Sequence, residues 1–416
     1  MKHSMLSTVS LFAGLSGFIA VALSAQMAGE WPVSSVSAKS QSAPAAASSG
    51  TNIAVVWKES DGGVYVGRLT LDGKLLDFPG IKVGVSDLYV EPRIVFDGEN
   101  YIVGWVGKTA PYMVVKVARL APASGVVLDT GGVTLGSTRC GVGEMLANSL
   151  ALASSDTGTL VAWGDCVPPS HVVLTALARD LSHPPPATML SLWGPPPIAA
   201  AWNGHEWVVT WVEARFDLPE GNLWTMDIKG VRLSPTLDRL GPALLYPYDS
   251  PYEWTNSGGP DGGPFIASDG SEFLLMWTER VPFYYGFFPP VGPKRVMALR
   301  VPADGLLNAG AKPTRLATGQ AMGVVWDGSQ YNVALSSDSV PHALYVTQVA
   351  AHGPIESMAP LAAGPFPFTG DSSLLVIGPG RVKVVYTRPA QSEYGGVVRA
   401  FIASPHPIRR RASGNP

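Results

Sequence analysis

The sequence predicts an all-β protein, a seven-bladed β-propeller built from four-stranded antiparallel blades. Three observations predict this fold. Gly and Pro supply 46 and 37 of the 416 residues, and both interrupt helices. One hairpin pattern recurs along the chain at a period of about 50 residues, which is typical of propeller blades. Hydrophobic residues make up 46% of a chain that is long enough for one large all-β domain with a substantial core.

The repeat is clearest in residues 92–105 and 264–277, which share one spacing. Each copy reads as a proline, a short strand, an Asp-Gly pair and an alternating strand that ends in Trp. This pattern predicts a β-hairpin, in which the Asp-Gly pair supplies the positive φ angles of a tight turn. More divergent copies occupy residues 44–57, 150–163, 197–211, 322–335 and 373–386.

Each copy ends at a residue that serves as its anchor: Trp57, Trp105, Trp163, Trp211, Trp277, Leu335 and Tyr386. A second hairpin follows each anchor, so one unit holds four strands, named A to D in chain order. Seven units predict blades at about residues 44–90, 91–144, 145–194, 195–259, 260–320, 321–366 and 367–404. Six or eight blades are the alternatives, and a β-sandwich is the competing all-β fold, although it would not need this repeat.

Two repeated positions are expected to be structural. The anchor Trp residues should pack between neighbouring blades. An Arg recurs on the C strands, at Arg68, Arg119, Arg179, Arg232, Arg300 and Arg399, and we expect it to be stacked or ion-paired between blades.

The chain ends are predicted to lie outside the blades. Residues 1–25 have the charged, apolar and small-residue regions of a secretory signal peptide with cleavage near Ser24 or Ala25, and an uncleaved anchor helix is the alternative. We therefore expect a secreted, periplasmic or cell-envelope protein that is not integral to the membrane after cleavage. Residues 26–43 form a linker with a possible ring-closing strand, 31–36. Residues 405–416 form a basic flexible tail, although 408–411 could instead supply the closing strand.

The two cysteines, Cys140 and Cys166, are expected to form a disulfide in an oxidising compartment. Free thiols are the first alternative. A metal site is the second, although two thiols without a neighbouring His pair fall short of a tetrahedral ligand set.

The face that carries the B–C and D–A loops is expected to hold a ligand. In a blade that runs A-B-C-D, the A–B and C–D turns share the other face, and these turns are short. The B–C and D–A loops vary in length and are rich in aromatic residues around blades 4 and 5, which suits stacking on a sugar or packing on a protein. The expected ligand-binding residues are Trp224, Tyr246, Tyr248, Tyr252, Trp254, Phe283, Tyr284, Tyr285, Phe287 and Phe288. The alternative is that these rings fold inward and join the loops to one another.

A second candidate set is acidic and lies two residues past four anchors, at Glu59, Asp165, Glu213 and Glu279. If these carboxylates crowd the channel mouth, a pair could raise one pKa and act on a glycosidic bond. This is the catalytic alternative, a glycoside hydrolase or polysaccharide lyase. The structural alternative is that the acid belongs to the repeat and pairs with a nearby Arg.

Composition and missing motifs exclude several other functions. A net charge of −3 provides no basic field for nucleic acid. The sequence shows no zinc-binding His pair, nucleophile elbow, phosphate-binding loop or dinucleotide pattern. We therefore expect no cofactor and no metal, with calcium around Asp61 or Asp269 left open as an alternative.

The template Pro-x-Ile-x-x-Asp-Gly-x-x-Tyr-x-Val-x-Trp resembles a degenerate repeat of exported bacterial proteins that look like β-propellers, mostly uncharacterised. The resemblance covers residues 44–404. It differs from the Asp-box of sialidases, where the Asp turn joins the third and fourth strands. The resemblance implies a fold and no particular activity. The expected function is therefore a monomeric, non-catalytic propeller that binds an extracellular or envelope carbohydrate or protein around blades 4 and 5.

Overall fold

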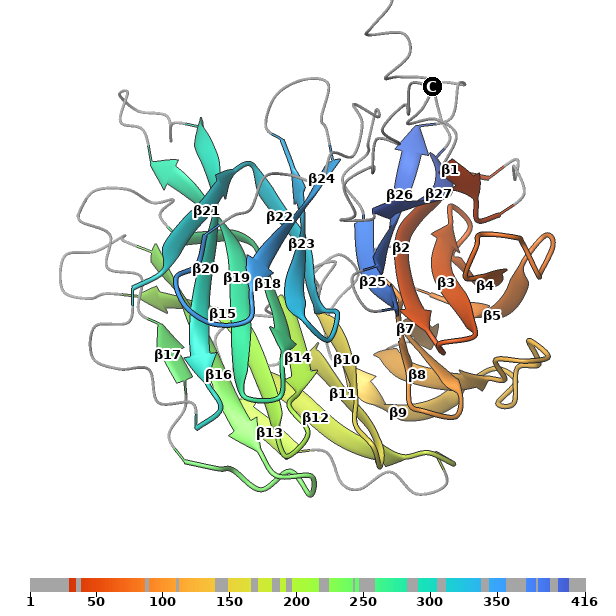
Figure 1. Ribbon diagram of the computed structural model, residues 1–416. Helices are drawn as coiled ribbons and strands as arrows, with labels where there is room; N and C mark the ends of the chain where they lie inside the picture. Colours follow the sequence, from red (N-terminus) through yellow and green to blue (C-terminus); the bar gives the residue numbers. More distant parts are fainter. Residues whose placement is uncertain are drawn as a thin grey trace, which may run out of the picture.

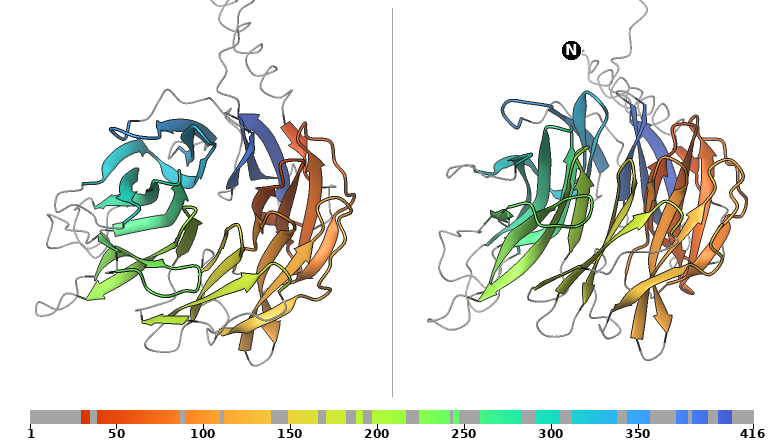
Figure 2. Two further views of the ribbon diagram at one scale, coloured as in Figure 1. Left: turned by 60° about the horizontal axis from the view of Figure 1, so that its bottom comes forward. Right: turned by 90° about the horizontal axis from the view of Figure 1, so that it is seen from below.

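The computed structural model describes residues 30–34, 39–86, 90–109, 112–138, 149–165, 171–181, 188–191, 197–216, 224–241, 244–246, 259–282, 291–304, 312–337, 344–356, 372–378, 381–389 and 396–403. These segments form seven antiparallel sheets arranged around a central axis (Figures 1 and 2). In each sheet the first strand is innermost, and the inner strands contact one another in the order β2, β6, β10, β14, β18, β22, β25 and back to β2. The protein is a seven-bladed β-propeller.

The first four blades each have four described strands. Blade 1 is β2 (Gln41–Ser48), β3 (Asn52–Glu59), β4 (Gly63–Thr70) and β5 (Ile81–Val85). Blade 2 is β6 (Arg93–Phe96), β7 (Tyr101–Thr109), β8 (Tyr112–Leu120) and β9 (Val133–Thr138). Blade 3 is β10 (Leu150–Ser154), β11 (Gly158–Asp165), β12 (His171–Ala178) and β13 (Thr188–Ser191). Blade 4 is β14 (Ile198–Trp202), β15 (Trp207–Phe216), β16 (Trp224–Leu233) and β17 (Leu244–Tyr246).

The last three blades complete the ring. Blade 5 is β18 (Gly259–Ser268), β19 (Glu272–Pro282), β20 (Val291–Pro302) and β21 (Thr314–Thr318). Blade 6 has three strands among its described residues, β22 (Gln320–Trp326), β23 (Gln330–Ser336) and β24 (Leu344–Ala350). Blade 7 is β25 (Ser372–Gly378), β26 (Arg381–Pro389), β27 (Gly396–Ala403) and β1 (Glu30–Pro32).

The ring is closed by the N-terminal strand, as the sequence predicted. Strand β1 pairs antiparallel with β27, with Trp31 opposite Ala400. Val33, which follows the strand, is fully buried in the cluster that joins blades 7 and 1. The alternative closing segment, residues 408–411, lies outside the described residues.

The first inner strand begins earlier than the expected blade start at residue 44. Strand β2 extends back to Gln41, which pairs with Glu59, so part of the expected linker 26–43 belongs to blade 1. The extension contains a bulge between Ser42 and Ala45, where Ala43 has φ 52°. The bulge interrupts the hairpin spacing, which is why the pattern hid the first residues of the strand.

The A–B turns differ from the expected two-residue turns. In blade 2 this turn spans Asp97 to Asn100, and Gly98, with φ 93°, is the residue of the turn with a positive φ angle. The Asp97 side chain takes the other role, because its Oδ1 accepts the backbone N–H groups of Glu99 and Asn100. The repeated Asp is therefore an acceptor that closes a four-residue turn, and its own φ need not be positive.

The anchors pack between blades, as expected. Seven hydrophobic clusters occupy the seven blade interfaces, and each combines residues of two consecutive blades. Trp105, for example, lies on blade 2 and packs among Val56, Val66 and Val83 of blade 1. In blade 6, where the anchor is Leu335, the large buried ring of the interface is Tyr331.

The C-strand arginines join blades in a different way from that expected. Arg68 forms a two-point ion pair with Asp77 of its own blade, and its Nη1 donates to the Pro122 carbonyl in the C–D turn of blade 2. Arg232 likewise pairs within blade 4 and donates to the Asp304 carbonyl of blade 5. The ion pairs thus lie within blades, while hydrogen bonds to carbonyls connect them.

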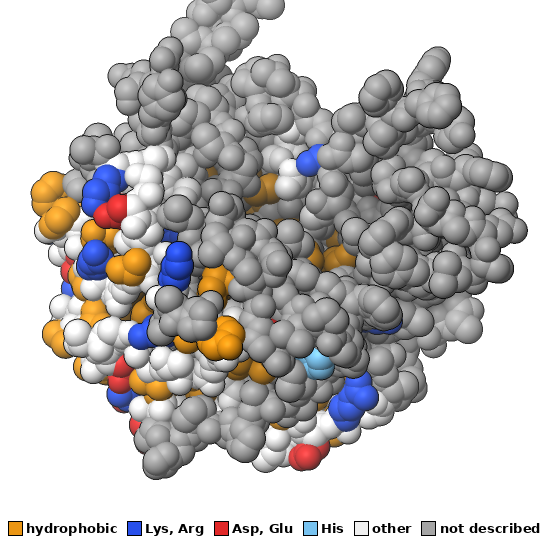
Figure 3. Space-filling view, turned by 180° about the vertical axis from the view of Figure 1, so that it is seen from behind, with side chains coloured by type: hydrophobic (Ala, Val, Ile, Leu, Met, Phe, Trp, Pro, Cys, Tyr) orange, Lys and Arg blue, Asp and Glu red, His pale blue; other side chains and the backbone are white. Residues whose placement is uncertain are grey.

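The outer surface of blades 1 and 2 carries exposed apolar side chains: Leu76, Phe78, Val85, Tyr112, Val126 and Leu128. In the space-filling view from behind, the described hydrophobic side chains are interspersed with Lys, Arg, Asp and Glu (Figure 3). Scattered apolar residues of this kind are usual on protein surfaces. Among the residues that the structure describes, none belongs to a helix with the length and apolar character needed to cross a bilayer.

Candidate functional site

A cavity of about 370 Å³ lies on the axis of the ring, and all seven blades contribute to its wall. The lining comes from the inner strands and is mostly small or apolar, for example Ala45, Leu152, Ala199 and Gly262. Small residues at the innermost positions leave open space where seven strands converge. A volume of this size is in the range of small-molecule pockets.

The cavity lies toward the face of the B–C and D–A loops. Its lining residues fall near the beginning of most inner strands, such as Ala43 in β2, Ala151 in β10 and Gln320 in β22, whereas in β18 they occupy the middle, residues 262–266. An inner strand runs from a D–A loop to an A–B turn, so its first residues lie near the D–A loops. The cavity therefore coincides with the face that the sequence predicted for ligand binding.

Four polar side chains line the cavity among the small and apolar ones. Arg93 Nη1 lies 2.8 Å from Glu91 Oε2, and both side chains are about one quarter exposed. Gln320 of blade 6 accepts a hydrogen bond from Lys294 Nζ of blade 5 at 3.2 Å. Ser373 Oγ accepts the Ala46 N–H at 3.2 Å. The cavity thus offers a cation, a carboxylate, an amide and a hydroxyl among small and apolar side chains.

Blades 4 and 5 extend further toward the loop face than blade 1. Strand β3 ends at Glu59, two residues past its anchor, whereas β15 and β19 end five residues past theirs, at Phe216 and Pro282. The register continues to these ends, with Phe216 opposite Trp224 and Pro282 opposite Val291. The B and C strands of these two blades therefore project further toward the loop face than β3 does.

Most of the expected aromatic ligand-binding residues lie outside the described residues: Tyr248, Tyr252, Trp254, Phe283, Tyr284, Tyr285, Phe287 and Phe288. Trp224 begins β16 and Tyr246 ends β17, so both residues lie at the loop-face end of blade 4. Residues 1–25, 405–416 and both cysteines, Cys140 and Cys166, also fall outside the described segments.

The acidic candidates do not form the wall of the cavity. Glu59, Asp165 and Glu279 sit at or near the ends of B strands in blades 1, 3 and 5, and they are 8%, 3% and 8% exposed. None of the three is among the lining residues, and they do not form a cluster within the described part of the chain. Glu213 lies at the matching position of β15, opposite Asp227. Glu59 is 4.0 Å from Lys39 Nζ, which fits the structural interpretation for this residue.

One group of metal-ligating side chains is brought together by the described residues, and the sequence analysis missed it as a group. Asp269, Glu272 and His352 place one ligand atom each within 4.8 Å of one another. His352 is 80 residues further along the chain than Glu272, so no local spacing reveals it. The contact arises because the turn after β24 packs on the A–B turn of blade 5.

Comparisons with known proteins give a fold. No family model matches the chain, and no curated protein matches it. Among solved structures, the polysaccharide lyase Uly1 is 10% identical, with a TM-score of 0.54 over 85% of this chain and 88% of that one. The β-propeller domain of the Trilobed protease from Pyrococcus furiosus is 12% identical, with a TM-score of 0.47 over 87% and 95%. A lectin from Aleuria aurantia is 11% identical, with a TM-score of 0.42 over 77% and 95%.

At these identities a structural likeness describes the arrangement of the backbone and leaves the chemistry of the site open. The chain has the β-propeller fold, and the likeness to the polysaccharide lyase Uly1 extends over most of both chains.

Proposed function

We propose that this protein is an exported, non-catalytic binding propeller that holds a carbohydrate at the channel mouth, on the face of the B–C and D–A loops. The observation that carries the proposal is the axial cavity, which lies toward this face and combines small and apolar side chains with polar groups. The B–C and D–A loops of blades 4 and 5 would form one side of the site, with their aromatic residues stacking on the sugar.

The polar groups of the cavity suit hydroxyl recognition. A sugar presents donors and acceptors around a ring with apolar faces, so its site needs both kinds of hydrogen-bonding group. Arg93 donates, Glu91 accepts, and Gln320 does both. The surrounding Ala and Gly surface allows close approach of a ring, which would then be oriented by these three side chains.

The same wall argues against a catalytic site. Hydrolysis of a glycosidic bond uses two carboxyl groups that face the substrate about 5–9.5 Å apart. Glu91 is the one carboxylate among the residues that line the cavity, and its partner Arg93 holds it in an ion pair. Glu59, Asp165 and Glu279 are buried away from the wall. Binding without turnover is therefore the function that the described residues favour.

A glycan array probed with the purified chain tests the proposal, with Arg93→Gln as the site variant. We expect the variant to weaken binding of the selected glycan about tenfold, which corresponds to about 1.4 kcal/mol. Arg239→Gln is the matched control, because it removes an exposed cation outside the cavity and should leave the affinity unchanged. Equal affinity of Arg93→Gln and the wild type, or no glycan bound while a protein partner is captured, would contradict the proposal.

A second variant tests the contribution of the loops. Replacing Trp254, Tyr284 and Tyr285 together by Ala removes three rings from loops of the same face. Stacking on a sugar predicts a loss of affinity larger than that of Arg93→Gln, with the thermal midpoint unchanged. Unchanged affinity would place the sugar in the channel alone, and a fall in the thermal midpoint would assign the rings to the core. Turnover of any bound polysaccharide would refute the non-catalytic assignment.

A further inference from the structure

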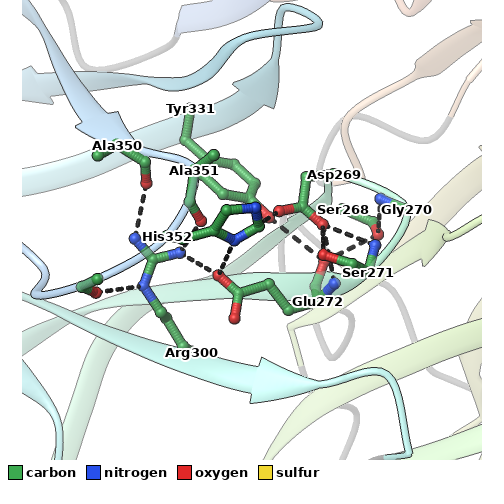
Figure 4. Close-up of polar contacts among 11 residues, drawn as sticks. Ser268, Asp269, Gly270, Ser271, Glu272, Arg300, Tyr331, Ala350, Ala351 and His352 are labelled. Carbon is green, nitrogen blue, oxygen red and sulfur yellow. Dashed lines mark hydrogen bonds and ion pairs between the residues drawn. The ribbon is translucent and has the colours of Figure 1, made fainter.

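The A–B turn of blade 5 and the C–D turn of blade 6 meet on the face opposite the proposed sugar site. Asp269 lies in the first turn, Glu272 begins β19, and His352 lies in the second turn (Figure 4). His352 Nδ1 is 3.9 Å from Asp269 Oδ2 and 3.9 Å from Glu272 Oε1. Three potential ligands from two blades thus point at one another.

One carboxylate oxygen of Asp269 is buried and faces the imidazole of His352 beyond hydrogen-bond distance. Its side chain is only 3% exposed, and its Oδ2 has no hydrogen-bond partner. The other oxygen, Oδ1, accepts the N–H groups of Ser271 and Glu272 and the Ser271 hydroxyl, so the carboxylate cannot rotate without breaking the turn. A buried carboxylate oxygen without a partner is costly, and a cation at this point would satisfy it.

The turn that carries His352 is held in place. Arg300 of β20 donates to the carbonyls of Ala350, Ala351 and Gly353, which surround His352 in the chain. The same guanidinium pairs with Glu272. The imidazole is therefore mounted on a fixed turn, while its ring is 72% exposed and can rotate toward the two carboxylates.

The corresponding A–B turns of other blades do not bring three potential metal ligands together among the described residues. In blade 4, Asn203 replaces the Asp, and Arg232 binds both oxygens of Glu206. In blade 6, Asp327 Oδ2 accepts a hydrogen bond from Asn332 Nδ2 at 2.7 Å. Asp97 of blade 2 also has a partnerless Oδ2, yet it belongs to no group of three ligands among the described residues.

The charge of the cluster favours a cation. Two carboxylates face one guanidinium, which leaves the site net negative when His352 is neutral. Burial opposes ionisation of Asp269, but the N–H groups of Glu272 and Ser271 outweigh it and lower its pKa, so the carboxylate is charged at neutral pH. Burial and these acidic neighbours raise the pKa of Tyr331, so its phenol stays neutral beside the site.

We propose that Asp269, Glu272 and His352 bind a borderline divalent ion of the Zn²⁺ class, with water in the remaining position. One imidazole and two carboxylates match zinc better than calcium or magnesium, which take oxygen ligands. A tetrahedral ion with bonds of about 2.0–2.2 Å holds its ligand atoms about 3.3–3.6 Å apart, so rotation of His352 would shorten its two 3.9 Å distances by a few tenths of an ångström. A shift of the Glu272 side chain would bring its oxygen within the same distance of Asp269. The ion would clamp blade 5 to blade 6, and this role is independent of the sugar site.

Calorimetric titration of the tag-free, metal-stripped chain with ZnCl₂ tests the proposal. We expect one ion at this site, and a thermal midpoint that rises with Zn²⁺ concentration because only the folded ring brings the ligands together. His352→Ala should abolish the midpoint shift, and Asp269→Asn should weaken binding about 10–100-fold while Asn keeps the turn, as Asn203 does in blade 4. His205→Ala is the matched control, because His205 is exposed in the A–B turn of blade 4, and its loss should not affect Zn²⁺ binding.

Three results would overturn the assignment. The first is no heat and no midpoint shift up to about 1 mM Zn²⁺, which would make the cluster an ordinary His–carboxylate contact. The second is unchanged Zn²⁺ binding in both His352→Ala and Asp269→Asn. The third is an intense thiolate charge-transfer band after loading with Co²⁺, which would place the ion on the cysteines instead.

Discussion

Trp105 of blade 2 lies directly against Gly84 of blade 1. A Cβ on Gly84 would be 2.6 Å from the indole Cζ2 atom, closer than real Cβ atoms approach other atoms. Gly132 repeats the relationship from the blade's own outer edge, with a Cβ distance of 2.5 Å to Trp105. The anchor ring therefore fits into a slot from which side chains are missing, and the outer-strand glycines are as much a part of the blade interface as the Trp.

Gly84→Ala should destabilise the ring by about 1–3 kcal/mol, because the added methyl group overpacks the Trp105 slot. Urea unfolding followed by Trp fluorescence measures this loss. Gly262→Ala is the control, since a Cβ there meets Thr278 Oγ1 at an ordinary 3.4 Å. Equal stability of the two variants would show that the interface adjusts freely and that the slot is not a constraint.

Arg68→Met should cost about 3–5 kcal/mol, because it leaves the carboxylate of Asp77 without its partner in a mostly buried site. The variant also removes the hydrogen bond to the Pro122 carbonyl of blade 2. Chemical unfolding of Arg68→Met, Asp77→Leu and the double variant forms a cycle. We expect the double variant to be more stable than Arg68→Met, and a double variant at least as unstable as the sum of both changes would contradict the pairing.

The Arg119–Asp129 pair should make stability depend on pH in the acidic range. Burial opposes ionisation of Asp129, but the hydrogen bonds from Arg119 outweigh it and lower its pKa below the ordinary value of about 3.9. Its contribution to stability is present above the unfolded-state pKa and disappears as the pH falls through the folded-state pKa. The free energy of unfolding should therefore differ between wild type and Asp129→Asn at pH 7 and converge below about pH 4. A constant difference from pH 7 to pH 2 would rule out this pair as the source.

Val33→Ala should weaken ring closure by about 2 kcal/mol, because Val33 is fully buried beside Trp57 at the junction of blades 7 and 1. Val126→Ala, at a position 54% exposed, is the control and should be nearly neutral. The hydrogen-exchange rate of amides in β27 measures the local effect. If β27 is protected equally in both variants, the N-terminal strand does not hold the last blade.

The sequence predicted the ring because its evidence is local and repeated. Each hairpin with its anchor lies within about 15 residues, so spacing alone predicted the blades. The closing strand was expected at residues 31–36, but the spacing left residues 408–411 as an alternative. The turn chemistry was wrong in detail, because sequence does not distinguish an Asp at positive φ from the Asp97 side chain as an acceptor. The arginine contacts and the Asp269–His352 cluster join different blades, and only the packing of consecutive blades brings such residues together. The acidic positions share a repeat register, yet that register points Glu59 and Asp165 into blade interfaces rather than the channel.

The pairing of β1 with β27 also determines when the ring can close during folding. Gln41 Oε1 accepts the Val398 N–H across a separation of 357 residues, and Val33 donates its own N–H to the Val398 carbonyl. The first strand of the ring to be synthesised, β1, therefore stays unpaired until β27, the last described strand, has been made. Until they pair, β1 and β27 each expose an unpaired strand edge, which is open to mispairing with other chains. If the protein is exported, as proposed, the ring can close only after its last blade has crossed the membrane.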